Sequence, residues 1–211
     1  MTNHKTRFAA ALKAAPIVAI IRGVLPENVI PVCEALTAGG VRLIEIPLNS
    51  PRPLESIEAA ARHYRGTDVL IGAGTVIKPD EVDKVARAGG TYIVSPNVDA
   101  GVICRTKEFN LVSVPGFFTP SEAFAALYAG ADFLKLFPAN RFGSAYLKDL
   151  RFVMQDPIIV VGGVTPENMA EYLALAQGVG IGRPFYEVGK PIIEVAEAAK
   201  RYMEAARKAR N

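Results

Sequence analysis

The feature of this sequence that most constrains its fold is a short, apolar, β-rich run that recurs along the whole chain. Successive runs begin roughly 20 to 27 residues apart, which is enough for one strand and one helix. Most of them are continuously apolar rather than alternating, a pattern typical of parallel strands covered on both faces. We expect eight strands, at residues 17–21, 42–46, 69–73, 91–94, 111–114, 133–137, 158–161 and 178–181.

The segments between these runs carry helix start and stop signals. A proline followed by an acidic residue predicts helix starts within 25–29, 78–82, 119–123 and 165–169. Glycines within 37–40, 87–90 and 128–131 predict the corresponding helix ends, just before a new strand. A further helical stretch at 5–14 precedes the first strand, and we expect it to close the bottom of a barrel.

Eight strand–helix units in 211 residues predict a compact (β/α)₈ barrel, with residues 1–211 forming a single domain. A doubly wound open sheet is the alternative. It is disfavoured because no G-x-G-x-x-G motif opens a helix after the first strand, where only Gly23 occurs.

Composition and charge exclude several classes of function. Half of the residues are hydrophobic and 21% are charged, as in ordinary soluble proteins, and the net charge of +3 is too small to indicate a nucleic-acid partner. No apolar run is long enough to cross a membrane, and no signal peptide is apparent, so we expect a cytoplasmic protein without a membrane partner. Cys33 and Cys104 lack metal-site or redox spacing, and we expect both to be buried in a reducing compartment.

Polar residues collect where the expected strands end, which is where (β/α)₈ barrels carry their chemistry. One acid, one lysine and one arginine would meet at a mouth that is otherwise apolar. The residues at these ends are Arg22, Glu45, Thr75, Pro96 with Asn97, Lys135, Gly162 with Gly163, and Gly182 with Arg183.

Lys135 lies inside the apolar segment "FLKLF". A lysine that reaches the rim or pairs with a carboxylate is the commoner arrangement. Here bulky neighbours surround the amine, so we expect burial to lower its pKa and leave a fraction neutral and nucleophilic. A neutral amine beside a carbonyl forms a Schiff base, which accepts electrons when a C–C bond breaks.

Glu45 is enclosed by isoleucines and would lie on the same rim as Lys135. A buried carboxylate near an ammonium is either a structural ion pair or an acid/base partner, and Schiff-base chemistry needs repeated proton transfer. Arg22 follows the first strand. It would either pair with Glu45 or bind a substrate carboxylate in bidentate fashion, and the sequence leaves both open.

Glycines between the seventh strand and the next helix suggest an anion site. Gly162 and Gly163 would let the backbone approach a phosphate, which barrels commonly bind at their last two loops. The eighth loop would add Gly182 and Arg183. The structural alternative is that these glycines only form tight turns.

Histidines are too few and too far from the strand ends to suggest a metal. The chain has only His4 and His63, and neither follows an expected strand. We therefore expect no metal and no cofactor.

Five motifs together resemble one family along almost the whole chain: "IEIPLNSP", "IGAGTV", "IVSPN", "LKLFPA" and "VVGGVTPEN". The chain resembles the 2-keto-3-deoxy-6-phosphosugar-acid aldolases. The resemblance implies cleavage of a phosphorylated keto-deoxy sugar acid to pyruvate and glyceraldehyde 3-phosphate by a metal-free homotrimer.

The resemblance also implies roles for individual residues. Asn49 and Val161 favour the galactonate type over the gluconate type, which differs at the C4 hydroxyl, although a gluconate or dual-specificity aldolase stays open. Arg183 departs from the small residue common in the family's phosphate loop. The implied site has Lys135 and Glu45 as catalytic residues, Arg22, Thr75, Pro96, Phe137 and Val161 around the substrate, and Gly162, Gly163, Gly182 and Arg183 at the phosphate.

Two other hypotheses use the same barrel. A metal-free phosphosugar isomerase or epimerase would share the phosphate loops but need no imine, so a Lys135→Arg variant would keep most of its activity. A non-catalytic sugar-phosphate-binding barrel would bind ligand without turnover, and it gives no reason for a lysine and a glutamate on one apolar rim.

Overall fold

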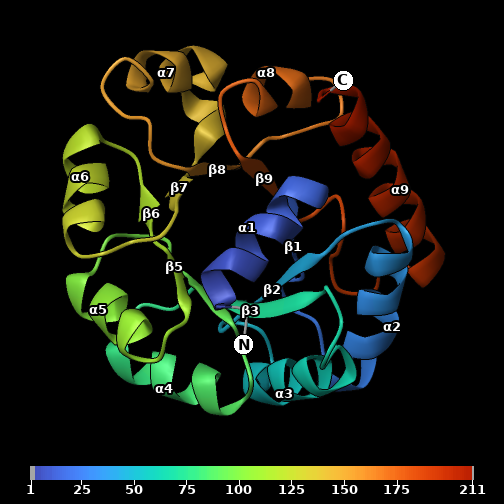
Figure 1. Cartoon of the computed structure of the whole chain (residues 1–211). Coiled ribbons are helices and arrows are strands. Elements are labelled where there is room, and N and C mark those ends of the chain that lie inside the picture. The colour runs from blue at the N-terminus through green and yellow to red at the C-terminus, as the bar shows by residue number, and fades with distance from the viewer. Residues whose placement is uncertain (1–2, 211) are drawn as a thin grey trace.

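The computed structural model describes residues 3–210, in which nine short parallel strands form a ring with helices around its outside (Figure 1). The strands are β1 (Ile17–Ile20), β2 (Leu43–Pro47), β3 (Leu70–Gly74), β4 (Tyr92–Val94), β5 (Val112–Val114), β6 (Gly116–Phe117), β7 (Leu134–Leu136), β8 (Ile158–Val161) and β9 (Gly178–Ile181). The helices are α1 (His4–Ala14), α2 (Pro26–Ala38), α3 (Pro53–His63), α4 (Pro79–Arg87), α5 (Ala100–Glu108), α6 (Pro120–Tyr128), α7 (Gly143–Leu150), α8 (Met169–Leu173) and α9 (Ile192–Lys208), with a 3₁₀ helix η1 (Ala139–Arg141).

The strands pair in chain order around the ring, and β1 also pairs with β9. Only Pro115, which has no N–H to donate, separates β5 from β6. The backbone hydrogen bonds to β7 continue across Pro115. The amide of Phe133 donates to the Ser113 carbonyl at 3.1 Å, and the amide of Lys135 donates to the Pro115 carbonyl at 2.8 Å. β5 and β6 are therefore one interrupted strand that closes an eight-stranded barrel.

This architecture confirms the predicted (β/α)₈ barrel with an N-terminal helix. The sequential strand order is wrong for a doubly wound sheet, in which the order reverses at a switch point. The runs predicted from the sequence fall on the observed strands, and β6 is the one addition.

Strand residues alternate between the barrel interior and the helix layer, as the two-residue period of a strand requires. Outward residues such as Ile44 and Leu134 belong to a large apolar cluster under the helices, whereas Val18 and Ile159 belong to a smaller inner cluster. Glycines take inward positions on β3 and β9. At Gly72 a Cβ would meet the Tyr92 ring at 2.5 Å, so glycine there makes room for that ring.

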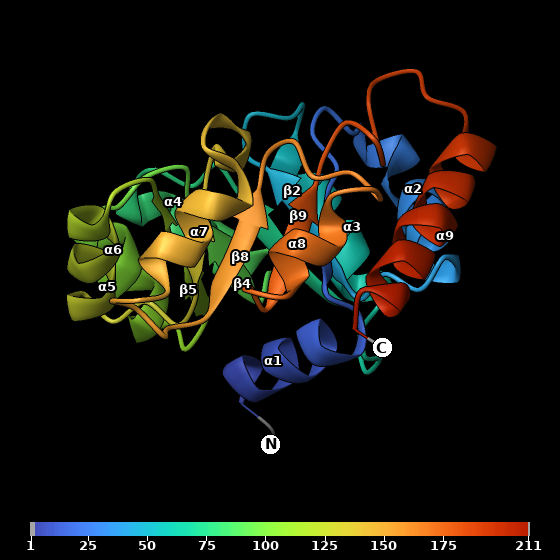
Figure 2. The same ribbon diagram turned by 90° about the horizontal axis from the view of Figure 1, so that it is seen from above.

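Helix α1 covers the end of the barrel where the strands begin, and the strands run away from it (Figure 2). Phe8 of α1 is fully buried, with its ring centroid 5.0 Å from that of Tyr92 and 4.9 Å from that of Phe133. The catalytic loops expected at the strand ends are therefore at the opposite, open end.

Three of the four predicted helix starts are observed, at Pro26, Pro79 and Pro120. The fourth prediction, a start within 165–169 headed by its proline, is wrong in detail, because α8 begins only at Met169. The Asn168 side chain explains the delay: it accepts from the Thr165 amide at 2.8 Å and donates to the Gly163 carbonyl at 2.9 Å, which holds a turn.

The prediction for the cysteines is half wrong. Cys33 is buried, but Cys104 is exposed on α5, where its thiol approaches the Ala129 carbonyl at 3.8 Å. Of the helices between residues 3 and 210, none combines the length and the apolar character needed to span a membrane.

Candidate active site

Lys135 is the middle residue of β7 and points into the barrel, because its neighbours Leu134 and Leu136 face the helix layer. Only 7% of the residue is exposed. Burial lowers the pKa of its amine, the positive charge of Arg22 lowers it further, and the negative charge of Glu45 opposes both. The Phe137 ring centroid lies 5.1 Å from Nζ.

Glu45 projects from β2 into the same interior and is 2% exposed. Its carboxyl group lies directly over Gly74 of β3, in space that the Cβ of any other residue would occupy. Burial raises the pKa of the carboxyl group, while the positive charges of Lys135 and Arg22 oppose this. The site thus favours a neutral amine and a protonated acid more than water does.

Lys135, Glu45 and Val161 line one small cavity inside the barrel. Within residues 3–210, the Lys135 amine and the Glu45 carboxylate form no ion pair within 4.0 Å. The two groups sense one another's charge across the cavity but do not neutralise one another by contact. Its remaining wall is almost wholly apolar: Phe8, Val18, Ile20, Val94, Val114, Ile159 and Gly180.

Arg22 forms no ion pair with Glu45. Of the two roles that the sequence leaves open for Arg22, pairing with Glu45 is therefore excluded. Its guanidinium donates to the Asn49 side-chain oxygen and, at 3.4 Å from both terminal nitrogens, to the Thr75 hydroxyl. Thr75 has a φ of 58°, a left-handed conformation that is strained by about 1–3 kcal/mol for such a residue. Strain of this kind is concentrated at functional sites.

Asn49 is a site residue whose contact with Arg22 the sequence analysis missed. It follows β2 by two residues, so its place at the strand-end rim was a usable signal. A neighbouring contact fixes the Arg22 loop, since the Ser50 hydroxyl accepts a hydrogen bond from the Gly23 amide at 2.9 Å.

Pro96 and Phe137 lie on the rim rather than in the cavity wall. Both are exposed, Phe137 by 40%, and Phe137 is the one that approaches the Lys135 amine. The Pro96 carbonyl oxygen lies so close to Gly116 that a Cβ at position 116 would collide with it.

The two glycine loops follow adjacent strands, since β8 pairs with β9. Gly162 and Gly163 have φ values of 109° and 71°, and Gly163 packs against Asn140 so closely that a Cβ would lie 2.5 Å from the Asn140 Cβ. Among the described residues, the amides of Gly162, Gly163, Gly182 and Arg183 have no backbone acceptor. Four N–H groups are therefore free at one corner of the open end.

The Arg183 side chain is exposed, and its backbone carbonyl accepts from the Lys190 amine at 3.4 Å. The Gly182 carbonyl is held in a turn by the amides of Phe185 and Tyr186. Among residues 3–210, no three His, Cys, Asp or Glu side chains gather in a way that could hold a metal ion.

Comparisons with known proteins point to one family. Residues 8–197 match the family described as "Aldolase: KDPG and KHG aldolase". The 2-dehydro-3-deoxy-6-phosphogalactonate aldolase of Escherichia coli (strain K12) is 43% identical over 197 residues, which cover 92% of this chain and 96% of that protein.

Two solved structures are similar over nearly their full lengths. One, described as "Native KDPGal structure", has a TM-score of 0.89 and 41% identity, and the match covers 92% of this chain and 95% of that one. The other is KDPG aldolase from Legionella pneumophila with pyruvate captured as a covalent carbinolamine. It has a TM-score of 0.80 and 27% identity, with 95% and 97% of the two chains covered.

Proposed function

This chain is a carbon–carbon lyase that belongs to the KDPG and KHG aldolase family, and on that premise we propose that it cleaves 2-dehydro-3-deoxy-6-phosphogalactonate to pyruvate and glyceraldehyde 3-phosphate. The observation that carries the proposal is Lys135, an amine with a lowered pKa in an apolar cavity shared with Glu45. Asn49 and Val161 support the galactonate type, as does the high identity to a relative that bears that name.

In the proposed mechanism, the neutral Lys135 amine attacks the keto carbon of the substrate. The carbinolamine loses water to give an imine, and the imine accepts the electron pair when the C3–C4 bond breaks. Glyceraldehyde 3-phosphate leaves, the enamine is protonated at its terminal carbon, and hydrolysis of the imine releases pyruvate. Glu45 transfers the protons, because burial raises its pKa and makes the carboxyl group a better proton donor and acceptor than one in water.

The remaining site residues bind the two ends of the substrate. The substrate carboxylate accepts from Arg22, which Asn49 and Thr75 hold at the rim. The phosphate accepts from the free amides of the two glycine loops. Pro96, Phe137 and Val161 pack around the pyruvyl group, and Gly162, Gly163, Gly182 and Arg183 surround the phosphate.

We extend the proposal to the setting of the enzyme. The whole chain, residues 1–211, acts as one domain, in a cytoplasmic homotrimer that serves galactonate catabolism. Family resemblance supports the trimer, and exposed apolar side chains such as Phe152, 81% exposed, offer surface for subunit contacts. Size-exclusion chromatography with light scattering tests the assembly directly.

Borohydride reduction in the presence of pyruvate tests the mechanism. The expected result is a three-carbon adduct on Lys135, located by mass spectrometry of peptides. Lys107 is a matched control, because its amine is held by Asp132 at 2.5 Å. An adduct on Lys107 but not on Lys135, or no adduct at all, contradicts the proposed mechanism.

The substrate is tested by comparing kcat/KM for the galactonate and gluconate epimers. A preference at C4 rests on one or two contacts of about 1–3 kcal/mol each, so we expect the galactonate epimer to be favoured by roughly tenfold or more. Equal values for the two epimers indicate a dual-specificity aldolase, and a reversed preference contradicts the galactonate assignment while leaving the lysine chemistry intact.

A further inference from the structure

A second cavity lies at the closed end of the barrel, away from Lys135. It is bounded by the last turns of α3 and α4, by the start of β3, and by α1. Its volume is about 270 Å³, and the apolar residues Val69, Leu70 and Ile71 contribute to its wall. Nothing in the proposed reaction uses this cavity.

The cavity gathers positive charge from three separate elements of the chain. Among the described residues that line it, the one acid is Glu58, which is bound by Arg62 at 2.9 Å. Within residues 3–210, none of the other three arginines has a carboxylate oxygen within 4.0 Å. The four arginines are Arg7, Arg62, Arg65 and Arg87.

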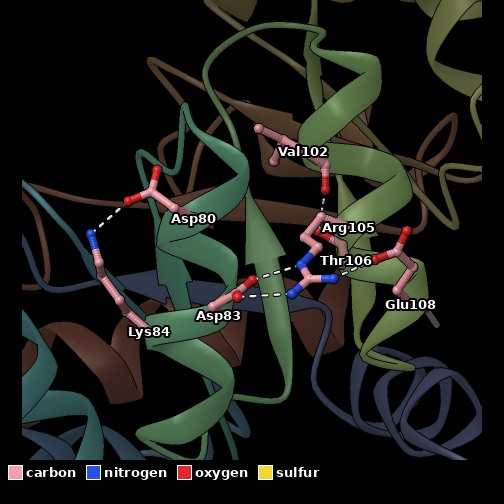
Figure 3. Close-up of polar contacts among 7 residues, drawn as sticks. All are labelled: Asp80, Asp83, Lys84, Val102, Arg105, Thr106 and Glu108. Atoms are coloured by element: carbon pink, nitrogen blue, oxygen red, sulfur yellow. Dashed lines mark hydrogen bonds and ion pairs between the residues drawn. The ribbon is translucent and has the colours of Figure 1, made fainter.

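An arginine with a structural role nearby is bonded quite differently. Arg105, on the last turn of α5, donates to both carboxylate oxygens of Asp83 at 2.7 and 2.8 Å and to Glu108 at 2.5 Å (Figure 3). Asp83 is also the acid whose pKa Arg87 helps to lower, but its oxygens are already taken by Arg105. Arg87 is thus left without an anion of its own.

Helix dipoles explain only part of this arrangement. Arg62 and Arg87 belong to the last turns of α3 and α4, where cations are favourable. Arg65 lies beyond the end of α3, and Arg7 comes from α1, where its guanidinium donates to the Thr67 carbonyl at 2.8 Å. Their convergence on one cavity therefore needs a further reason.

We propose that this pocket binds a small anion that carries two or more phosphate groups. Guanidinium groups pair with phosphate through two parallel hydrogen bonds, and they keep their charge at any physiological pH. Three positive charges without protein counterions match a ligand with about that much negative charge, and the cavity is large enough for more than one phosphate.

Pyrophosphate is the probe for the test. Phenylglyoxal modifies accessible guanidinium groups, and peptide mass spectrometry reports each arginine separately. With pyrophosphate present at constant ionic strength, we expect slower modification of Arg65 and Arg87 and no change at Arg201, an exposed arginine of α9 outside the pocket. This local measurement separates the pocket from any phosphate bound at the open end.

Calorimetry provides the second measurement. Replacing each guanidinium removes a charged hydrogen bond, so Arg65→Gln and Arg87→Gln should each raise the Kd of this site about tenfold. Arg201→Gln should leave it unchanged. Both pocket positions are exposed, and unchanged thermal unfolding verifies that the variants fold. Equal protection of Arg201, an unchanged Kd in the pocket variants, or no protection by pyrophosphate overturns the proposal.

Discussion

The two ends of the barrel both bury ionisable side chains, but they treat them in opposite ways. At the closed end, the Asp132 carboxylate is 4% exposed, accepts from the Lys107 amine at 2.5 Å and the Ser113 amide at 3.0 Å, and forms an ion pair with the Lys5 amine at 3.2 Å. At the open end, Lys135 and Glu45 share an apolar cavity without contacting one another.

The difference separates a cluster with direct partners from a buried pair without them. Asp132 exchanges the hydrogen bonds of water for three partners, and these tie α1 and α5 to the start of β7. Lys135 and Glu45 lose water and gain no direct partner, so burial shifts their pKa values toward the neutral forms. A charge left without a partner is unfavourable for stability and useful for chemistry.

The largest expected effect is on catalysis at the open end. Glu45→Gln keeps the shape of the side chain but cannot transfer a proton, so we expect kcat to fall by about 10²–10⁴-fold in a steady-state assay. The control is Asp132→Asn at the closed end, which should leave kcat within a few-fold of the wild type. Full activity of Glu45→Gln would remove that residue from the mechanism.

The next prediction concerns the stability of the open end. Replacing the buried pair with apolar residues of similar volume, Lys135→Met with Glu45→Leu, should abolish activity and raise the free energy of unfolding by up to about 1–4 kcal/mol. Urea denaturation of both proteins measures the difference. A destabilised but folded double variant would show that the pair is structural.

The closed end should respond in the opposite direction. Asp132→Ala removes two hydrogen bonds and an ion pair and leaves the Ser113 amide without its carboxylate acceptor, so we expect a loss of about 1–3 kcal/mol in the free energy of unfolding. Lys5 is half exposed, so its amine can return to water. Unchanged stability with reduced kcat would contradict the division between the two ends.

Local patterns in the sequence were sufficient to predict the barrel and the orientation of Lys135. The apolar runs recur at one interval, and the two-residue strand period turns Lys135 away from Leu134 and Leu136. Glu45 follows from the same argument on β2. The functional roles of these residues stay predictions that the proposed experiments test.

Contacts between distant loops were beyond the reach of the sequence. The bonds from Arg22 to Asn49 and Thr75 join three different strand ends, and no local pattern specifies which pairs of exposed side chains meet. The late start of α8 has a similar cause, because the Asn168 side chain competes with the backbone for the loop amides. Burial of Cys104 was predicted from its residue type alone. The residue lies on the exposed face of α5, so that prediction was wrong.

The smallest effect is a slope in stability with pH. The pKa of Lys135 in the folded protein is below the usual 10.5, so between these two values the unfolded chain binds one more proton than the folded one. The contribution of Lys135 to stability therefore rises with pH across this window, by at most about 1.4 kcal/mol per pH unit, and is constant below it. Urea denaturation at several alkaline pH values should show this rise in the wild type relative to Lys135→Met.

Lys107→Met is the matched control and should not remove the rise, because the Lys107 amine is held by a carboxylate. Parallel pH dependence in the wild type and Lys135→Met would mean that the amine at position 135 is no harder to protonate than one in water, and the contrast between the two ends of the barrel would fail.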